Sequence, residues 1–406
     1  MTRSYRNSDP RPPIMQGSSP PPEWRVPRDS WDRPPWNRWS FRNVRQILPT
    51  APVRRGHDGM RPLASDPQDI SAIAFEAADG AAMTVEDTLD ATYTDGFLVM
   101  LDGKAIHESY HNGMRPESLH LAQSVSKSVV GTVAGILIGR GLLDPLAPVT
   151  DYLPELAATG WAGARLRHVL DMTTGVKYDE TYTKPDSDMG KTDVAAGWKR
   201  APEGADWPGC IWDQILSLTE RDAEHGERFL YRSIETDVLA HAMERVTGTR
   251  LAELVSAELW QKLGAEEDAC FTVDSAGYAL ADGGFNASLR DFARFGLMHL
   301  NGGRVGDTQV VPRAWIDDIR AGDHGLFDDD HRDRFPNGRY RNQFWIEDAG
   351  RQTAMCLGVF GQMIYVSPEW NMVAVKLSTW PDFLDETHMA NTLGALHAIA
   401  RSFGRT

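Results

Sequence analysis

The chain has 406 residues, a formal net charge of −15 at pH 7 and 41% hydrophobic residues. This length can bury a large core and fits one large domain with an inserted or appended subdomain. No run of lysine and arginine dominates, so we expect no nucleic-acid partner. The three cysteines, Cys210, Cys270 and Cys356, show no metal-ligand spacing, which fits a reducing compartment, and we interpret them as core residues.

Residues 1–60 differ in composition from the remainder of the chain. Twelve of the 24 prolines occur by Pro62, together with four of the 13 tryptophans. This much proline excludes regular helix and sheet, whereas the tryptophans argue against simple disorder, because exposed indoles are costly. We expect an arm that packs on the body from about Asp29, with residues 61–406 forming the second unit. A fully disordered tail is the alternative.

The chain shows no targeting or membrane signal. Its first residues are polar and proline-rich and lack the apolar stretch of a secretory signal. The longest apolar run, Ser128 to Leu143, is too short for a membrane span and is interrupted by glycines. We therefore expect a cytoplasmic protein without a membrane partner.

A β-hairpin is predicted at residues 96–111, where two strand-like runs flank Asp102-Gly103. The second run, His107-Glu108-Ser109-Tyr110-His111, matches the H-E-x-x-H motif of zinc proteases, which requires both histidines on one turn of a helix. On a strand they lie about 13 Å apart, at roughly 3.3 Å per residue, too far for two ligands of one zinc ion. We expect no metal site here, and a zinc peptidase is the alternative hypothesis.

The segment Ser124-Val125-Ser126-Lys127 opens an apolar run of helical length and is the only S-x-x-K in the chain. Residues three apart share a helix face, so the Ser124 hydroxyl and the Lys127 ammonium can meet at the buried start of the helix. The N–H groups of the first turn would stabilise negative charge on a substrate oxygen there. Lys127 is one of only eight lysines, and a buried lysine, unlike arginine, can be tuned towards neutrality. The pattern predicts a nucleophilic serine for acyl transfer; a capping serine beside a solvated lysine is the alternative.

The remainder of the sequence predicts an α+β fold, an α/β sandwich. A mainly helical region is expected at about 145–280, with clear helical period at 235–246. Strand-like runs return at 342–346, 356–366 and 372–377, and an amphipathic helix is predicted at about 387–402. We expect the strands at about 94–115 and 340–380 to form one antiparallel sheet flanked by helices, with the helical region as an insertion.

Tyr231, in Tyr231-Arg232-Ser233, is a third candidate for the chemistry, because its loop could return a phenol to the Ser124 site. A tyrosine in a Y-x-S sequence is by itself usually a core or surface residue. Beside a lysine ammonium, however, a phenol of reference pKa about 10 is more easily ionised, and the phenolate can take the serine proton.

With S-x-x-K and Y-x-S together, the chain resembles the serine β-lactamase and penicillin-binding-protein-like hydrolases, in the branch with class C β-lactamases, D-aminopeptidases and esterases. Within that family it is most similar to the 6-aminohexanoate-dimer hydrolases. The segments that carry the resemblance are 29–31, 37–41, 124–128, 141–155, 167–175, 283–296 and 375–382.

The resemblance implies a β-lactamase-like antiparallel sheet flanked by helices, hydrolysis through an acyl-enzyme, and no cofactor. It implies Ser124 as the nucleophile, Lys127 as its proton partner, and Tyr231 as the general base and then the general acid. The backbone N–H groups of Ser124 and Val359 would hold the oxyanion.

For the substrate, the resemblance implies that Tyr182 contacts the scissile amide and that Asp193 meets an ammonium end. Asp282 stands where the 6-aminohexanoate-dimer hydrolases have asparagine, and this charge is expected to change the substrate. In the C-terminal helix, Met389 occupies the position that matches a histidine of those enzymes, next to His388.

The family's third motif, K-T-G or H-x-G, falls here on Cys356-Leu357-Gly358 or on Phe360-Gly361-Gln362, depending on the register. Neither segment contains a cation. A penicillin carboxylate would lack its usual partner, so β-lactamase activity is disfavoured.

The sequence therefore predicts a cytoplasmic serine hydrolase that cleaves a small-molecule amide or ester, without cofactor or metal, and it allows for a homodimer. A carboxylesterase and a D-amino-acid amidase are alternative activities of the same fold. A non-catalytic binding relative is the alternative from another class, because a fold alone does not confer chemistry.

Overall fold

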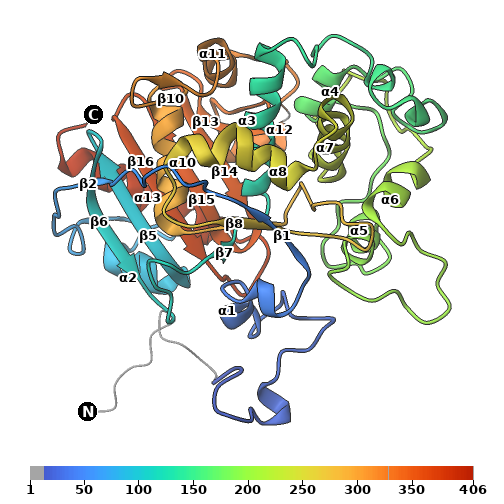
Figure 1. Cartoon of the computed structure of the whole chain (residues 1–406). Coiled ribbons are helices and arrows are strands. Elements are labelled where there is room, and N and C mark those ends of the chain that lie inside the picture. The colour runs from blue at the N-terminus through green and yellow to red at the C-terminus, as the bar shows by residue number, and fades with distance from the viewer. Residues whose placement is uncertain (1–12, 328, 406) are drawn as a thin grey trace.

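The computed structural model describes residues 13–327 and 329–405, and its central feature is an eight-stranded sheet. The strands, in spatial order, are β12 (Arg339–Arg341), β13 (Phe344–Asp348), β14 (Thr353–Gly358), β15 (Gln362–Ser367), β16 (Met372–Ser378), β5 (Thr94–Leu101), β6 (Lys104–Tyr110) and β2 (Ala64–Ser65). Neighbours are antiparallel, except that β2 runs parallel to β6. The early hairpin and the late strands thus share one sheet, as predicted (Figure 1).

The predicted hairpin is confirmed as β5 and β6. Asp102 and Gly103 have φ of 50° and 76°, the two positive values that a tight hairpin turn favours. His107 lies on β6, so the helical geometry of the zinc motif is not formed. Instead, Nε2 of His107 and Nε2 of His111 lie 3.0 and 3.1 Å from Ser109 Oγ.

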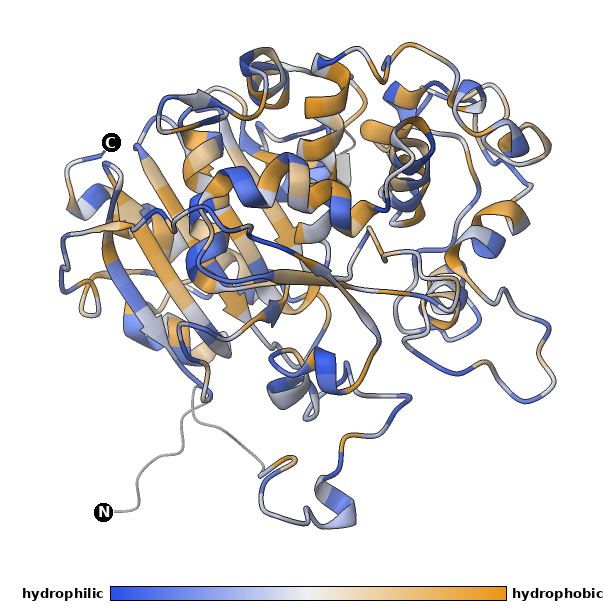
Figure 2. Ribbon diagram, viewed as in Figure 1, coloured by the Kyte–Doolittle hydropathy of each residue, from blue (hydrophilic) through white to orange (hydrophobic). Residues whose placement is uncertain are grey.

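Helices cover both faces of the sheet. Because side chains alternate along a strand, Leu98 of β5 belongs to the core shared with α3 (Val125–Gly139) and α10 (Leu289–Leu300), and Val99 to the core shared with α2 (Val85–Ala91) and α13 (Glu386–Ser402). Figure 2 shows hydrophobic residues along the central strands. The architecture is the predicted α+β sandwich.

The predicted helical insertion lies beside this sandwich, at the right of Figure 1. It contains η3 (Val149–Asp151), η4 (Pro154–Ala158), α4 (Leu166–Leu170), α5 (Asp188–Ala195), α6 (Ile211–Ser217) and α7 (Ile234–Thr247). The chain then returns across the centre of the molecule as α8 (Leu251–Val255), the π-helix η5 (Ser256–Trp260) and α9 (Gln261–Leu263), which pack with α3 and α10. Smaller elements elsewhere are β3 (Ala74–Glu76), β4 (Ala82–Thr84), β10 (Arg304–Val305), β11 (Thr308–Gln309), α11 (Arg313–Ala321) and α12 (Asp329–Arg334).

The N-terminal arm contains more regular structure than its prolines suggested. Besides η1 (Pro22–Trp24), α1 (Asn37–Ser40) and η2 (Val44–Gln46), it contributes β1 (Thr50–Val53) to a second sheet, of order β1-β8-β9-β7. The partners in that sheet are β8 (Ala269–Thr272), β9 (Phe285–Ala287) and β7 (His120–Leu121).

The prediction that proline excludes helix and sheet from this arm is therefore wrong. Pro52 is accommodated because β1 is an edge strand, where one missing N–H donor costs no ladder bond. Trp31 and Phe41 are fully buried in the main core. Residues 1–12 of the predicted arm lie outside the described part of the chain.

Two of the three cysteines are core residues, as expected: Cys270 and Cys356 are buried, whereas Cys210 is partly exposed, and all three are free thiols. Among the helices described, none combines the length and the apolar composition needed to cross a bilayer.

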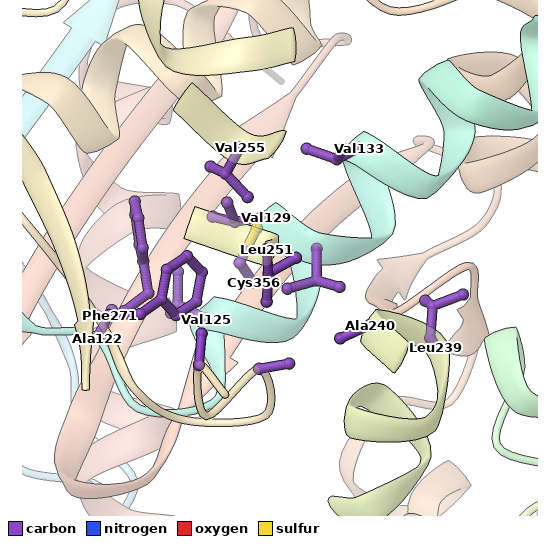
Figure 3. Close-up of a cluster of buried hydrophobic side chains, with 14 of the residues drawn as sticks. Ala122, Val125, Val129, Val133, Leu239, Ala240, Leu251, Val255, Phe271 and Cys356 are labelled. Atoms are coloured by element: carbon purple, nitrogen blue, oxygen red, sulfur yellow. The ribbon is translucent and has the colours of Figure 1, made fainter. Parts of the chain in front are cut away.

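Helix α3 is packed on all sides, and the core residues along it include Val125, Val129 and Val133 (Figure 3). Its glycines allow other elements to approach closely. A Cβ added at Gly135 would lie 2.3 Å from the indole of Trp315 in α11, a distance that real Cβ contacts essentially never show. The helix that begins at Ser124 is thus held in place from several directions.

We predict that Gly135→Val lowers the free energy of unfolding by about 2 kcal/mol or more, because overpacking forces the core apart. Urea unfolding followed by circular dichroism measures this. Gly59→Val is the matched control, because no heavy atom lies within 4 Å of a Cβ at Gly59. Equal stability of the two variants would show that α3 and α11 are not in close contact.

Candidate active site

The start of α3 brings together the two residues of the S-x-x-K motif. Lys127 Nζ donates a hydrogen bond to Ser124 Oγ at 2.9 Å and another to the backbone carbonyl of Asp282 at 2.7 Å. Lys127 is 1% exposed, whereas Ser124, at the N-cap, is partly exposed. The serine hydroxyl is therefore accessible, and the ammonium beside it is held from the protein interior.

The charge of Lys127 is maintained by its surroundings. Burial lowers the pKa of Lys127, but the neighbouring Tyr231, Asp282 and Glu180 together raise it by more than burial lowers it. The pKa therefore lies above the ordinary lysine value. A buried lysine can be tuned towards neutrality, but here the surroundings favour the charged ammonium that the Tyr231 hypothesis requires. Carboxyl groups near a buried ammonium, here those of Asp282 and Glu180, favour the cation.

Tyr231 lies beside this pair, as the Y-x-S pattern predicted. Its ring centroid is 5.3 Å from Lys127 Nζ, and its ring stacks on Trp345 with centroids 5.5 Å apart. Burial raises the pKa of Tyr231 above that of free tyrosine, although the charge of Lys127 and hydrogen bonding with Ser124 oppose the shift. The phenol is thus protonated at neutral pH, and the ammonium makes its ionisation easier than burial alone would allow.

Asp282 contributes its backbone carbonyl to the site. A side-chain oxygen of Asp237, in α7, accepts a hydrogen bond from the N–H of Ala281 at 2.9 Å and so fixes the turn that presents this carbonyl to Lys127. Both carboxyl groups are buried, and burial raises the pKa of each. Asp282 therefore contacts Lys127 of the S-x-x-K motif through its backbone carbonyl.

Val359 reaches the same site from the large sheet. The predicted single strand at 356–366 is two strands, β14 and β15, joined by the turn η6 (Val359–Gly361). A Cβ at Gly358 would lie 2.5 Å from the carbonyl oxygen of Ala122, so only glycine lets the end of β14 approach the segment before Ser124 so closely. Leu357, Gly358 and Val359 therefore lie beside Ser124.

A cavity of about 630 Å³ opens in front of Ser124. Its apolar lining consists mainly of Trp345, Leu357, Trp380, Phe383, Leu384 and Met389. His331 and Arg334 of α12 also line it, so the guanidinium of Arg334 reaches the cavity from an element other than β14 and β15. The cavity has room for a small organic substrate with an apolar group.

Tyr182 and Glu180 form one wall of this cavity. The Tyr182 hydroxyl donates to Glu180 at 2.8 Å, and the carboxylate also accepts from the hydroxyl and the N–H of Ser233, at 2.5 and 2.9 Å. Because Tyr182 donates its proton to Glu180, its oxygen is left as an acceptor for an N–H group in the cavity. The ring of Tyr182 stacks on Phe383, with centroids 5.3 Å apart.

Asp193 lies on the other side of Ser124, along a narrow compartment of about 20 Å³ whose lining also includes Asp282. Its carboxylate is paired with the ammonium of Lys199. Burial raises the pKa of Asp193 to about 6, while Lys199 opposes the shift. The residue expected to meet a substrate ammonium is therefore already partnered by a cation of the protein.

The N-terminal arm supports the loops that surround the cavity. The Arg33 guanidinium lies 3.8 Å from the ring centroid of Phe383 and donates to the carbonyl of Tyr182 at 3.0 Å. Asn37 donates to the carbonyl of Trp380 at 3.0 Å. In α13, Met389 lines the cavity, whereas His388 packs edge-on against Trp380.

Glu180, Asp237, Lys199 and Arg33 were missed by the sequence reasoning. Glu180 precedes Tyr182 by two positions, which was the one local signal available for it. Asp237 and Arg33 contact segments that are distant in the sequence, and Lys199 meets Asp193 only because of how helix α5 ends. No sequence motif marks single charged residues of this kind.

Comparison with known proteins agrees with this geometry. Residues 81–399 match the Beta-lactamase family model. The 6-aminohexanoate-dimer hydrolase of Paenarthrobacter ureafaciens is 39% identical over 356 residues, which cover 87% of this chain and 88% of that protein.

Solved structures show the same relationship. A Bacillus anthracis protein described provisionally as a 6-aminohexanoate-dimer hydrolase superposes with a TM-score of 0.87 at 27% identity, covering 95% of this chain and 99% of that one. A family VIII carboxylesterase, at 15% identity, shares the fold with a TM-score of 0.58, covering 84% and 100% of the two chains. This chain belongs to the β-lactamase family and is a hydrolase of that family.

Proposed function

We propose that the protein cleaves small-molecule amides or esters through an acyl-enzyme on Ser124. The observation that carries the proposal is the 2.9 Å hydrogen bond from Lys127 to Ser124 Oγ at the edge of an organic-sized cavity, with Tyr231 beside both. Nucleophilic catalysis needs a hydroxyl, a group that takes its proton, and a group that stabilises the charge produced.

The proton moves between Ser124 and Tyr231. The Tyr231 phenolate, stabilised by the Lys127 ammonium, takes the hydroxyl proton as Ser124 Oγ bonds to the substrate carbonyl carbon. The resulting phenol then gives this proton to the leaving amine or alkoxide as the scissile bond breaks. Water, deprotonated by the regenerated phenolate, attacks the acyl carbon and releases the acid, and the proton returns to Ser124.

The oxyanion of each tetrahedral intermediate is assigned to the N–H groups of Ser124 and Val359. Two features support this assignment: Ser124 begins a long buried helix, and the close contact at Gly358 brings the β14–β15 turn to its side. Tyr182, with its proton donated to Glu180, would accept the N–H of a scissile amide.

The substrate is a molecule with an apolar portion, in keeping with the lining of the cavity. The Paenarthrobacter relative is named for the 6-aminohexanoate dimer. We extend hydrolase activity to this chain, with an amide or ester as the substrate, and we propose a cytoplasmic location because its three cysteines are free thiols.

We predict that Ser124→Ala lowers kcat by at least about 10⁴-fold on a p-nitrophenyl ester, because the substitution removes the hydroxyl that forms the acyl-enzyme. It should also abolish the mass increase that an alkyl fluorophosphonate causes. Ser128→Ala is the matched control, because Ser128 lies on the same helix and donates to the carbonyl of Gln343 instead. Labelling of Ser124→Ala at the wild-type rate would contradict the assignment.

We also predict that kcat/KM increases with pH, about tenfold per pH unit between about pH 7 and about pH 9. The active form is the Tyr231 phenolate, and because burial raises the pKa of Tyr231 above 10.0, the phenolate fraction is still growing throughout this range. Lys127, whose pKa is also raised, stays charged. Tyr231→Phe, which keeps the ring, should lose about 10²-fold or more and flatten the profile. A plateau near neutral pH in the wild-type enzyme would refute this role.

A further inference from the structure

The pairing of Asp193 with Lys199 has a local structural origin. Helix α5 ends just before Gly197, whose φ of 72° is left-handed, and the N–H groups of Trp198 and Lys199 bond back to the carbonyl of Asp193 at 2.8 and 3.2 Å. This reversal returns the Lys199 side chain over its own helix, where its ammonium meets the Asp193 carboxylate. The pair is thus a product of the helix end rather than of a flexible surface contact.

A second carboxylate holds Lys199 from the opposite side. Asp32, from the N-terminal arm, lies 3.5 Å from Lys199 Nζ, and its side chain is 5% exposed. Asp32 is fixed in turn, because Trp31 next to it donates to the carbonyl of Trp198 at 3.0 Å and packs edge-on against the Trp198 ring. Lys199 therefore bridges two nearly buried carboxylates from distant segments.

The charges in this cluster balance. Asp32 and Asp193 supply two negative charges, and Lys199 and Arg33, whose Nε is 3.7 Å from Asp32, supply two positive charges. A cationic group that reaches Asp193 would find no excess negative charge on this cluster. It would also have to displace a partly buried ion pair, which is costly.

We propose that Lys199 is a specificity-determining residue: its ammonium occupies the position that Asp193 would otherwise offer to a cationic substrate end, so the enzyme selects acyl groups without a positive charge. This inference rests on the proposed function, because it concerns the acyl group that Ser124 receives. On the Ser124 side, the compartment beside Asp193 holds about 20 Å³, room for roughly one water molecule, which disfavours a hydrated ammonium. On its other side Asp193 lines a cavity of about 260 Å³ together with Lys199 and Arg33, so a cationic group approaching from there meets two cations of the protein.

Two isosteric esters test the inference, p-nitrophenyl heptanoate and p-nitrophenyl 6-aminohexanoate, which differ in a terminal methyl or ammonium group. The wild-type enzyme should prefer the heptanoate by at least about tenfold in kcat/KM. Lys199→Met should shift this ratio towards the aminohexanoate by about tenfold, because Asp193 and Asp32 are then left with an excess of negative charge. Adding Asp193→Asn to Lys199→Met should remove most of the gain.

Lys191→Met is the matched control. Lys191 lies within α5, the helix that carries Asp193, and pairs with Asp188 at 3.8 Å. Its loss removes one positive charge without exposing the Asp193 carboxylate, so the ratio should remain that of the wild type. Lys199→Gln is a second variant in case Lys199→Met does not fold.

Equal wild-type activity on the two esters, or an unchanged ratio in both Lys199 variants, would overturn the role of Lys199. Hydrolysis that persists in Ser124→Ala, or a failure of the wild-type enzyme to cleave either ester, would instead contradict the proposed function and with it this inference.

Discussion

The site depends on one buried cation. Lys127 is almost completely removed from water, and an isolated ammonium there would be strongly destabilising. The structure compensates with two hydrogen bonds from Nζ, to Ser124 Oγ and to the Asp282 carbonyl, and with acidic groups on several sides. The same ammonium contacts Ser124 Oγ and adjoins the Tyr231 ring. Under the proposed function, its electrostatic field would act directly on the atoms that react.

Several elements of the fold position Lys127 and the residues around it. Helix α3 supplies Ser124 and Lys127 together, and its glycines allow neighbouring elements to pack against it without gaps. Helix α7 follows Tyr231 and, through Asp237, fixes the turn that contains Asp282. The end of β14 then closes the site, because Gly358 permits contact with the backbone of Ala122. Three separate parts of the chain thus converge on one helix end.

The parts of this arrangement that follow local rules could be predicted from the sequence. Ser124 and Lys127 are three residues apart on a helix, so their contact required no knowledge of the tertiary structure. The β5–β6 hairpin followed from Asp102-Gly103, and the sheet from the alternation of apolar strands and helices. The prediction for Tyr231 had weaker support, because the Y-x-S pattern indicates a catalytic tyrosine only in combination with the S-x-x-K motif, whose lysine is 104 positions away.

Other features could not be predicted, since they depend on contacts between distant segments. The charge state of Lys127 is set by Glu180 and Asp282 as well as by burial, and burial alone suggested the opposite direction. The strand β1 contains Pro52 and forms because it lies at a sheet edge, which composition does not reveal. The pairing of Asp193 with Lys199 depends on how helix α5 ends, and its stabilisation by Asp32 depends on where the N-terminal arm packs.

The most direct test of the account is a crystal structure of the enzyme after reaction with an alkyl phosphonate, a stable mimic of the tetrahedral intermediate. The account predicts phosphorus bonded to Ser124 Oγ, a phosphoryl oxygen about 3 Å from the backbone nitrogens of Ser124 and Val359, and Lys127 still bonded to the Asp282 carbonyl. An adduct on another residue, or a Lys127 side chain that has left the carbonyl of Asp282, would contradict it.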